Sequence, residues 1–276
     1  MATWFITGAS AGIGRAVAEQ LLKAGHRVAA TARDENRLEV LRRQGGELWT
    51  TTLDVTDTRA VRDVVGRAFA DLGRIDVIFS NAGRGAVGAA EELSDEAIAE
   101  QIAVNLTGPI QLIRAALPHL RAQGGGRIIQ TTTMGAQISS PGASLYHASK
   151  WGIEGFLESL VPEVAPFGIG VTMIEPGSVR TDFGAALSIA DPLPAYAATP
   201  AGRLHRYIKA GGGNLTADAP GDPARVAAAI ITAATTTPAP RRLTLGSDAH
   251  AAVQAALTGR QAELDKALAA STDFPS

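Results

Sequence analysis

The chain has 276 residues, of which 46% are hydrophobic and 19% charged, so it suits one large α/β domain with a sizeable core and argues against disorder. Its net charge of −2 gives no electrostatic basis for nucleic-acid binding, and the absence of cysteine excludes disulfides, thiolate catalysis and cysteine-ligated metals. The five histidines show no close metal-ligand spacing, so no metal site is expected.

The N-terminal stretch 2–7 leads directly into a glycine-rich turn, without the basic start and long apolar run of a signal peptide. No apolar run further along the chain reaches the length of a membrane span. We therefore expect a cytoplasmic protein that makes no contact with membranes.

Short apolar runs alternate with longer amphipathic stretches along the chain. Strands are expected at Trp4–Thr7, Arg27–Thr31, Leu48–Leu53, Val77–Ser80, Arg127–Thr131, Gly170–Ile174 and Arg242–Leu245. Helices are expected at Ile13–Lys23, Asn36–Gln44, Arg59–Leu72, Ser94–Arg121, Leu145–Ala165, Pro223–Ala233 and Ala249–Leu268. Repeated strand–helix–strand units predict right-handed crossovers, so the expected fold is α/β: a doubly wound, Rossmann-type parallel sheet of seven strands with helices on both faces.

A single domain is expected over residues 1–270, with one segment that breaks the strand–helix rhythm. Residues 183–221 are rich in Ala, Pro and Gly and include Gly211-Gly212-Gly213. The segment follows the carboxyl end of a strand, where such folds bind ligands, so it is interpreted as a mobile substrate lid. A plain surface insertion is the alternative. Residues 271–276 are expected to form a frayed tail.

A glycine-rich turn, Thr7-Gly8-Ala9-Ser10-Ala11-Gly12-Ile13-Gly14, follows the first expected strand and opens the first helix. Gly8 allows a tight turn, while Gly12 and Gly14 leave no side chain where a pyrophosphate and the adjacent backbone must approach. Free amides at the start of the helix then face the anion. The turn is predicted to bind a dinucleotide through Gly8, Ser10, Gly12, Ile13 and Gly14.

The end of the second expected strand bears on the choice between NAD and NADP. An NAD site commonly has a carboxylate there for the ribose 2′-hydroxyl, but this chain has Ala32. The next residue, Arg33, carries a guanidinium that suits a 2′-phosphate. We therefore predict that NADP is preferred over NAD, which stays possible because Asp34 lies next to Arg33 and can turn inward.

Two further strand ends carry residues assigned to cofactor binding. Asp54 and Val55 follow the third expected strand, and Asp54 can accept a hydrogen bond from the adenine amino group or cap the helix that begins near Thr58. The fourth strand ends in Asn81-Ala82-Gly83, where small residues let the backbone lie against the cofactor; a simple turn is the alternative.

Tyr146 and Lys150 lie four residues apart at the start of a helical segment, so they share one helical face. A free phenol has a pKa near ~10, too high for a base at neutral pH, and a nearby ammonium favours the phenolate and lowers that pKa. Tyr146 can then exchange a proton with a substrate oxygen. The alternative is an aromatic core residue beside a surface lysine, which the position after the fifth strand disfavours.

Together these motifs resemble the short-chain dehydrogenase/reductase family in its compact single-domain form, from about residue 3 to residue 260. The similarity is carried by Thr7-Gly8-x-x-x-Gly12-x-Gly14, Asp54, Asn81-Ala82-Gly83, Asn105, Tyr146-x-x-x-Lys150 and Pro176-Gly177. The resemblance implies that Tyr146 is the general acid/base and that Lys150 holds the nicotinamide ribose hydroxyls and depresses the pKa of the tyrosine.

The resemblance also assigns roles to two other segments. It implies that Asn105 organises a water chain to the lysine; as a polar residue in mid-helix, Asn105 is also expected to bend the helix or bond a neighbouring backbone group. Residues 176–181 match the segment that lies along the nicotinamide and diphosphate. The residues assigned to cofactor binding in that segment are Pro176, Gly177, Val179 and Thr181.

One position departs from the family pattern. The family normally has a serine thirteen residues before the tyrosine, and this chain has Thr133. Threonine keeps the hydroxyl, which can donate to a substrate oxygen, but its methyl restricts χ1 and fills space. We assign the catalytic donor to Thr133 over Ser139 and Ser140, which lie further along the chain.

The expected function is that of an NADP-dependent oxidoreductase acting on a carbonyl or secondary alcohol of a hydrophobic small molecule, because the lid supplies apolar residues. A non-catalytic NADP-binding redox sensor on the same fold is the alternative, since fold alone does not settle function. A third hypothesis is a sugar-nucleotide epimerase or dehydratase on a related fold. It is disfavoured because such enzymes usually need a larger C-terminal substrate domain than 276 residues allow. By resemblance, and from the apolar surface of the two longest helices, a homodimer or homotetramer is expected.

Overall fold

The computed structural model describes residues 1–211 and 216–270. Gly212 and Gly213 of the predicted lid, and the predicted tail 271–276, lie outside the described residues. Within the described ranges, no helix combines the length and the apolarity that a bilayer crossing requires.

A seven-stranded sheet forms the centre of the molecule, with strand order β3-β2-β1-β4-β6-β7-β9 and every neighbouring pair parallel. Its strands are β1 (Thr3–Thr7), β2 (Arg27–Ala32), β3 (Glu47–Thr52), β4 (Val77–Ser80), β6 (Gly126–Thr131), β7 (Ile169–Pro176) and β9 (Arg242–Leu245). Every residue of β1 and β4 is buried, as expected of central parallel strands covered on both faces. The predicted doubly wound α/β fold is confirmed.

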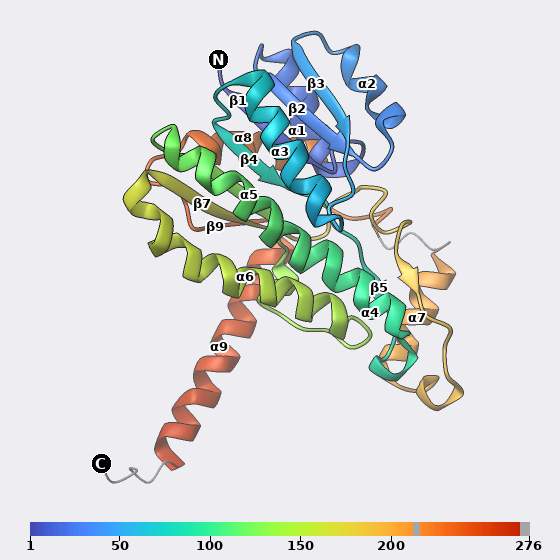
Figure 1. The fold of residues 1–276 in the computed structure, drawn as a ribbon. Coiled ribbons are helices and arrows are strands. Elements are labelled where there is room, and N and C mark those ends of the chain that lie inside the picture. Colours follow the sequence, from blue (N-terminus) through green and yellow to red (C-terminus); the bar gives the residue numbers. More distant parts are fainter. Residues whose placement is uncertain (212–215, 271–276) are drawn as a thin grey trace.

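Helices pack on both faces of this sheet (Figure 1). The sheet separates two hydrophobic cores, one on each face. On one face, α3 (Thr58–Leu72), α5 (Gly108–Ala122) and α6 (Ser144–Val164) bury apolar side chains against the strands. On the other face, α1 (Gly12–Lys23) and α8 (Pro223–Thr235) do the same, next to the short α2 (Glu39–Arg42). The C-terminal α9 (Ser247–Ala270) starts beside β9 and projects away from the body (Figure 1).

Two predicted helices differ in the structure. The predicted helix Ser94–Arg121 is two helices, α4 (Asp95–Ile102) and α5, joined by a π-helical segment at Ala103–Thr107. Asn105 lies in that segment, where its side chain bonds backbone groups of another loop, as described below. The predicted helix Asn36–Gln44 is a 3₁₀ segment, Glu35–Leu38, followed by the single turn of α2.

The predicted lid carries structure that the sequence analysis missed. A two-residue strand, β8 (Ser188–Ile189), pairs in parallel with β5 (Ala86–Val87). A further helix, α7 (Pro200–Ala210), begins with Thr199 accepting a hydrogen bond from the Gly202 amide and with proline in its first turn. The segment is therefore tied to the loop that follows β4.

Candidate active site

The glycine turn between β1 and α1 is shaped to admit a dinucleotide. Gly8 and Gly12 have φ values of 65° and 54°, in the left-handed region that favours glycine. A Cβ at Gly14 would lie 2.4 Å from Asn81 Nδ2 and 2.5 Å from the Gly8 carbonyl oxygen, so no side chain fits there. Ala11, which precedes α1, offers no side-chain cap, and the first turn has no acidic residue. The helix amides thus remain for an anion, which is the donor set that a pyrophosphate needs.

Asn81 joins this turn to the middle of the sheet. Its Nδ2 donates to the carbonyl oxygens of Thr7 (3.2 Å) and Gly8 (3.3 Å), and its Oδ1 accepts from the Thr131 hydroxyl at 3.1 Å. The Thr7 hydroxyl accepts from the amides of Asn81 (2.9 Å) and Ala82 (3.1 Å). These hydrogen bonds connect the ends of β1, β4 and β6, and Asn81 stabilises the position of the glycine turn.

The two charged residues that follow β2, Arg33 and Asp34, differ in their hydrogen bonding. Arg33 is exposed and makes no hydrogen bond or ion pair within residues 1–211 and 216–270. Asp34 is occupied locally, because its Oδ1 accepts from the Asn36 amide at 3.0 Å and caps the following 3₁₀ segment. The guanidinium is thus available to a ligand, while the neighbouring carboxylate is turned to the backbone.

Asp54 does not cap α3. Its Oδ1 accepts from the amide (2.9 Å) and hydroxyl (2.7 Å) of Thr56, whereas Asp57 is the residue that accepts from the first amides of α3. Val55 lies against the start of α5, where a Cβ on Gly108 would come within 2.8 Å of the Val55 carbonyl oxygen. Both residues follow the carboxyl end of β3.

Tyr146 and Lys150 occupy the first turns of α6, next to the end of β6. Lys150 is only 4% exposed, its Nζ donates to the Thr131 carbonyl oxygen at 3.1 Å, and the same Nζ lies 5.9 Å from the centre of the Tyr146 ring. The hydroxyl of Thr133 lies close enough to the Tyr146 phenol to act on its pKa. The three residues that the sequence analysis assigned to catalysis from 133 to 150 are therefore brought together.

The electrostatics of this pair are dominated by burial. Desolvation raises the pKa of Tyr146 to about 12, although the hydroxyl of Thr133 acts to lower it. Desolvation also lowers the pKa of Lys150 to about 8, opposed by the charge of Glu154. The resemblance predicts that Lys150 depresses the tyrosine pKa, but burial is the largest cause acting on it, and at neutral pH the phenol is protonated.

Asn105 is buried and contacts α6 at Ser149, the residue before Lys150. Its Oδ1 accepts from the Arg84 amide at 2.9 Å, and its Nδ2 donates to the Arg84 carbonyl oxygen at 2.8 Å and to Ser149 Oγ at 3.2 Å. Asn105 is expected to bend its helix or to bond a neighbouring backbone group; it lies in the π-helical segment and bonds the backbone of Arg84, 21 residues away in the chain. A Cβ at Gly83 would lie 3.6 Å from Asn105 Oδ1 and 3.8 Å from Lys150 Nζ, so Gly83 borders the same space.

The loop that follows Thr133 is fixed to α6 by His147. The ring Nε2 of His147 accepts from the Ser140 amide at 3.0 Å, and its Nδ1 lies 2.6 Å from the Gly135 carbonyl oxygen. The Ser140 hydroxyl is also within 3.0 Å of that Nε2, so its hydrogen bonding is directed to the histidine. This geometry favours Thr133 over Ser140 as the hydroxyl beside Tyr146.

Residues 176–181 run from the end of β7 across the mouth of the glycine turn. The Gly177 amide donates to the Leu245 carbonyl oxygen at 2.9 Å, and Thr181 lies 3.5 Å from the position of a Cβ on Gly12. Asp248, at the start of α9, accepts from the Ser178 amide at 2.8 Å and fills the space beside Gly177. The sequence analysis missed Asp248, because 70 residues separate it from the segment that it holds.

Residues of the predicted lid lie beside Tyr146. Phe183 lies with its ring centre 6.1 Å from that of Tyr146, and a Cβ at Gly85 would meet Leu187 at 2.4 Å and Phe183 at 3.2 Å. The Glu92 carboxylate accepts from the Leu193 amide at 2.9 Å, and the Tyr196 hydroxyl donates to Glu91 at 2.9 Å. An apolar side chain therefore lies beside the Tyr146 ring, and two carboxylates hold Leu193 and Tyr196 of this segment.

Comparison with known proteins gives consistent matches along the chain. The family model for short chain dehydrogenases matches residues 2–191. An oxidoreductase from Botryotinia fuckeliana is 36% identical over 249 residues, covering 89% of both chains. A solved short-chain dehydrogenase from Streptomyces avermitilis is 37% identical with a TM-score of 0.89, covering 98% of each chain. An alcohol dehydrogenase from the archaeon Thermococcus sibiricus, solved with 5-hydroxy-NADP, is 28% identical with a TM-score of 0.71, covering 89% of this chain and 96% of that one.

Proposed function

Because the chain belongs to the short-chain dehydrogenase/reductase family, we propose that Tyr146 exchanges a proton with the substrate oxygen and that Lys150 supports it. As a member of this family, the protein is an oxidoreductase that depends on NAD or NADP and acts on CH–OH or C=O groups. The observation that carries the proposal is the grouping of Thr133, Tyr146 and Lys150 beside the glycine turn.

The chemistry divides between cofactor and chain. When bound, the nicotinamide supplies or accepts the hydride at the substrate carbon. The Tyr146 phenol, with a pKa of about 12, is protonated at neutral pH and is set to donate to a carbonyl oxygen. The Lys150 ammonium stabilises the phenolate that is left, and the Thr133 hydroxyl offers a second donor for the same oxygen. This arrangement favours carbonyl reduction.

We propose Gly8, Ser10, Gly12, Ile13 and Gly14 as the phosphate-binding turn. Arg33 is proposed to bind a 2′-phosphate, because it is exposed and unpaired among the described residues while Asp34 caps a backbone amide. This supports a preference for NADP, and the 5-hydroxy-NADP bound to the Thermococcus sibiricus relative is consistent with it. Asp54, Val55, Asn81-Ala82-Gly83 and residues 176–181 are proposed to line the rest of the cofactor groove.

The proposed substrate is a hydrophobic ketone, aldehyde or secondary alcohol. Phe183 lies beside the Tyr146 ring, and Phe183 and Leu187 pack on Gly85 after β4, so apolar side chains border the space at Tyr146. The segment is proposed to act as a lid on a single domain. The intact Tyr146–Lys150 pair favours an enzyme over a non-catalytic redox sensor.

A homodimer or homotetramer is proposed through α5 and α6, whose outer apolar residues are only partly buried.

The test is an NADPH-oxidation screen over hydrophobic ketones, aldehydes and diketones with the wild type and Tyr146→Phe. We expect turnover with the wild type and a loss of at least roughly 100-fold in kcat with the variant, because the proton donor is removed. NADPH affinity, measured by fluorescence titration, should be retained and serves as the control for folding. Equal turnover by Tyr146→Phe would contradict the assignment.

A further inference from the structure

Helix α6 carries four titratable side chains spaced four residues apart, at Tyr146, Lys150, Glu154 and Glu158. The proposed function uses the first two. Glu154 is 3% exposed and lies in the apolar layer between α6 and the sheet, although it takes no part in the proton transfer proposed above. A buried carboxylate is costly unless it is paired and hydrogen-bonded, so its surroundings indicate what it does.

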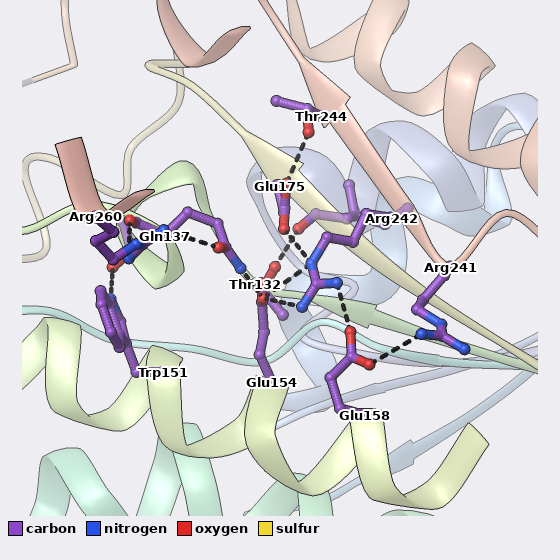
Figure 2. Close-up of polar contacts among 12 residues, drawn as sticks. Thr132, Gln137, Trp151, Glu154, Glu158, Glu175, Arg241, Arg242, Thr244 and Arg260 are labelled. Carbon is purple, nitrogen blue, oxygen red and sulfur yellow. Dashed lines mark hydrogen bonds and ion pairs between the residues drawn. The ribbon is translucent and has the colours of Figure 1, made fainter. Parts of the chain in front are cut away.

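A cluster of polar side chains from four elements surrounds Glu154 (Figure 2). Arg242 of β9 places Nη2 3.2 Å from Glu154 Oε2 and Nε 2.9 Å from Glu175 Oε1 of β7. Gln137, which follows the loop from β6, donates to Glu154 Oε2 at 2.5 Å, and Arg260 of α9 donates to the Gln137 carbonyl oxygen at 2.8 Å. The Glu154 carboxylate is therefore fixed in position.

The charges in the buried part of the cluster do not balance. Two carboxylates, Glu154 and Glu175, are 3% and 1% exposed, and they share the single guanidinium of Arg242. The third carboxylate, Glu158, also contacts Arg242 but is paired with Arg241 at 3.2 Å, nearer the surface. One positive charge is thus missing from the buried part, and a second cation close by would supply it.

Lys150, one turn before Glu154 on the same helix, is the candidate for that cation. Its Nζ donates to the carbonyl oxygen of Thr131, and Glu154 lies close enough to the next residue, Thr132, for that hydroxyl to lower the pKa of the carboxyl. The two charged groups therefore meet neighbouring residues at the same end of β6. Lys150 is as buried as Glu154, and in a medium of low polarity the attraction between opposite charges is strong.

Building on the proposed role of Lys150, we propose that Glu154 is a positioning residue for the reaction: clamped by Arg242 and Gln137, its carboxylate keeps the Lys150 ammonium protonated and directed to the end of β6 beside Tyr146. The residue does not touch substrate or cofactor. It acts through Lys150, and Arg242 acts through Glu154.

The electrostatic causes agree with this geometry. Burial lowers the pKa of Lys150 to about 8, and the charge of Glu154 is the cause that opposes the decrease. Burial is the largest cause acting on the pKa of Glu154 and, with the charge of Glu175, raises that pKa on balance; Thr132 and Arg242 oppose the increase and so act in favour of the charged carboxylate. Without the Glu154 charge, Lys150 would lose its proton at a lower pH.

Lysine titration by NMR, with labelled lysine side chains, tests the proposal directly. The chain has four lysines, of which Lys23, Lys209 and Lys266 are exposed, so the Lys150 signal can be assigned by its loss in Lys150→Met. We expect Glu154→Gln to lower the titration midpoint of Lys150 by about one pH unit or more. The falling alkaline limb of kcat/KM for carbonyl reduction should move down by the same amount.

Glu158→Gln is the matched control, because it removes a partner of the same Arg242 but lies eight residues from Lys150. It should leave the Lys150 midpoint unchanged, and Glu154→Asp, which keeps the charge, should titrate closer to the wild type than Glu154→Gln does. An unchanged midpoint in Glu154→Gln, or an equal shift in Glu158→Gln, would overturn the proposal. These titrations need no turnover, so they fail independently of the proposed function, which depends on Tyr146→Phe.

Discussion

At the scale of single residues, three consecutive threonines at the end of β6 organise the site. The Thr131 carbonyl oxygen accepts from Lys150, the Thr132 hydroxyl acts to lower the pKa of Glu154, and the Thr133 hydroxyl acts to lower the pKa of Tyr146. Each threonine engages a different turn of α6. The register between this strand end and the helix therefore sets the spacing of the proposed proton donor, its ammonium partner and the carboxylate behind them.

Thr133→Val tests the hydroxyl in the position where the family normally has serine. Valine roughly keeps the shape but removes the hydroxyl beside Tyr146 and with it the second donor for the substrate oxygen, so kcat should fall by roughly 100-fold with a smaller change in KM. Steady-state kinetics measure both values. Thr133→Ser should retain most of the turnover, and an undiminished kcat in Thr133→Val would transfer the role to another group.

Arg33→Ala tests the choice of cofactor. Loss of a charge-assisted bond to the 2′-phosphate should raise KM for NADPH by roughly tenfold or more and leave KM for NADH unchanged. Arg43→Ala is the matched control. Arg43 is also exposed, and it follows α2. It lies close in sequence to Gly46, which packs on Leu22 at the end of α1 opposite the glycine turn. Equal NADPH KM values for the wild type and Arg33→Ala would show that the 2′-phosphate is held elsewhere.

At the scale of elements, the turn from β1 to α1 depends on Gly14. A methyl group there would approach the Gly8 carbonyl oxygen and the Asn81 side chain to 2.4–2.5 Å, so the turn must shift. We expect Gly14→Ala to lower the free energy of unfolding by about 1–3 kcal/mol and to weaken NADPH binding. Urea unfolding and fluorescence titration measure the two effects.

Gly66→Ala on α3 is the control for that substitution, because a Cβ at Gly66 meets nothing within 4 Å. It should stabilise the protein by up to about 1 kcal/mol, since alanine is favoured over glycine in a helix. If Gly14→Ala behaved like Gly66→Ala, the close packing of the phosphate turn would not matter for folding or binding.

The elements that sequence reasoning predicted well are those with strong local patterns. The strands Val77–Ser80 and Arg242–Leu245 have the predicted bounds, because their apolar runs end at turn residues. The π-helical break at Asn105 was missed as a boundary, since its cause is a pair of bonds to Arg84 in another loop. The pairing of β5 with β8 was not predicted, because two-residue strands are too short to show an alternating pattern. The Glu154–Arg242 pair was not predicted either, because 88 residues separate its members in the chain.

At the scale of the whole molecule, the parallel sheet brings distant segments to one edge. The ends of β1, β4, β6 and β7 supply the glycine turn, Asn81, the threonines and residues 176–181, while α6 supplies Tyr146 and Lys150. The segment 183–221 adds an apolar wall over that edge. The glycine turn, Tyr146 and Phe183 therefore lie at one edge of the sheet, where folds of this kind bind ligands.

The central claim, hydride transfer to a carbonyl carbon with protonation by Tyr146, is tested most directly by isotope transfer. The wild type is supplied with NADPH deuterated at the transferable position and a hydrophobic ketone, and the alcohol is analysed by mass spectrometry and NMR. The account predicts one deuterium on the carbinol carbon and essentially no labelled alcohol with Tyr146→Phe. Alcohol without deuterium, or equal labelled product from both proteins, would contradict it.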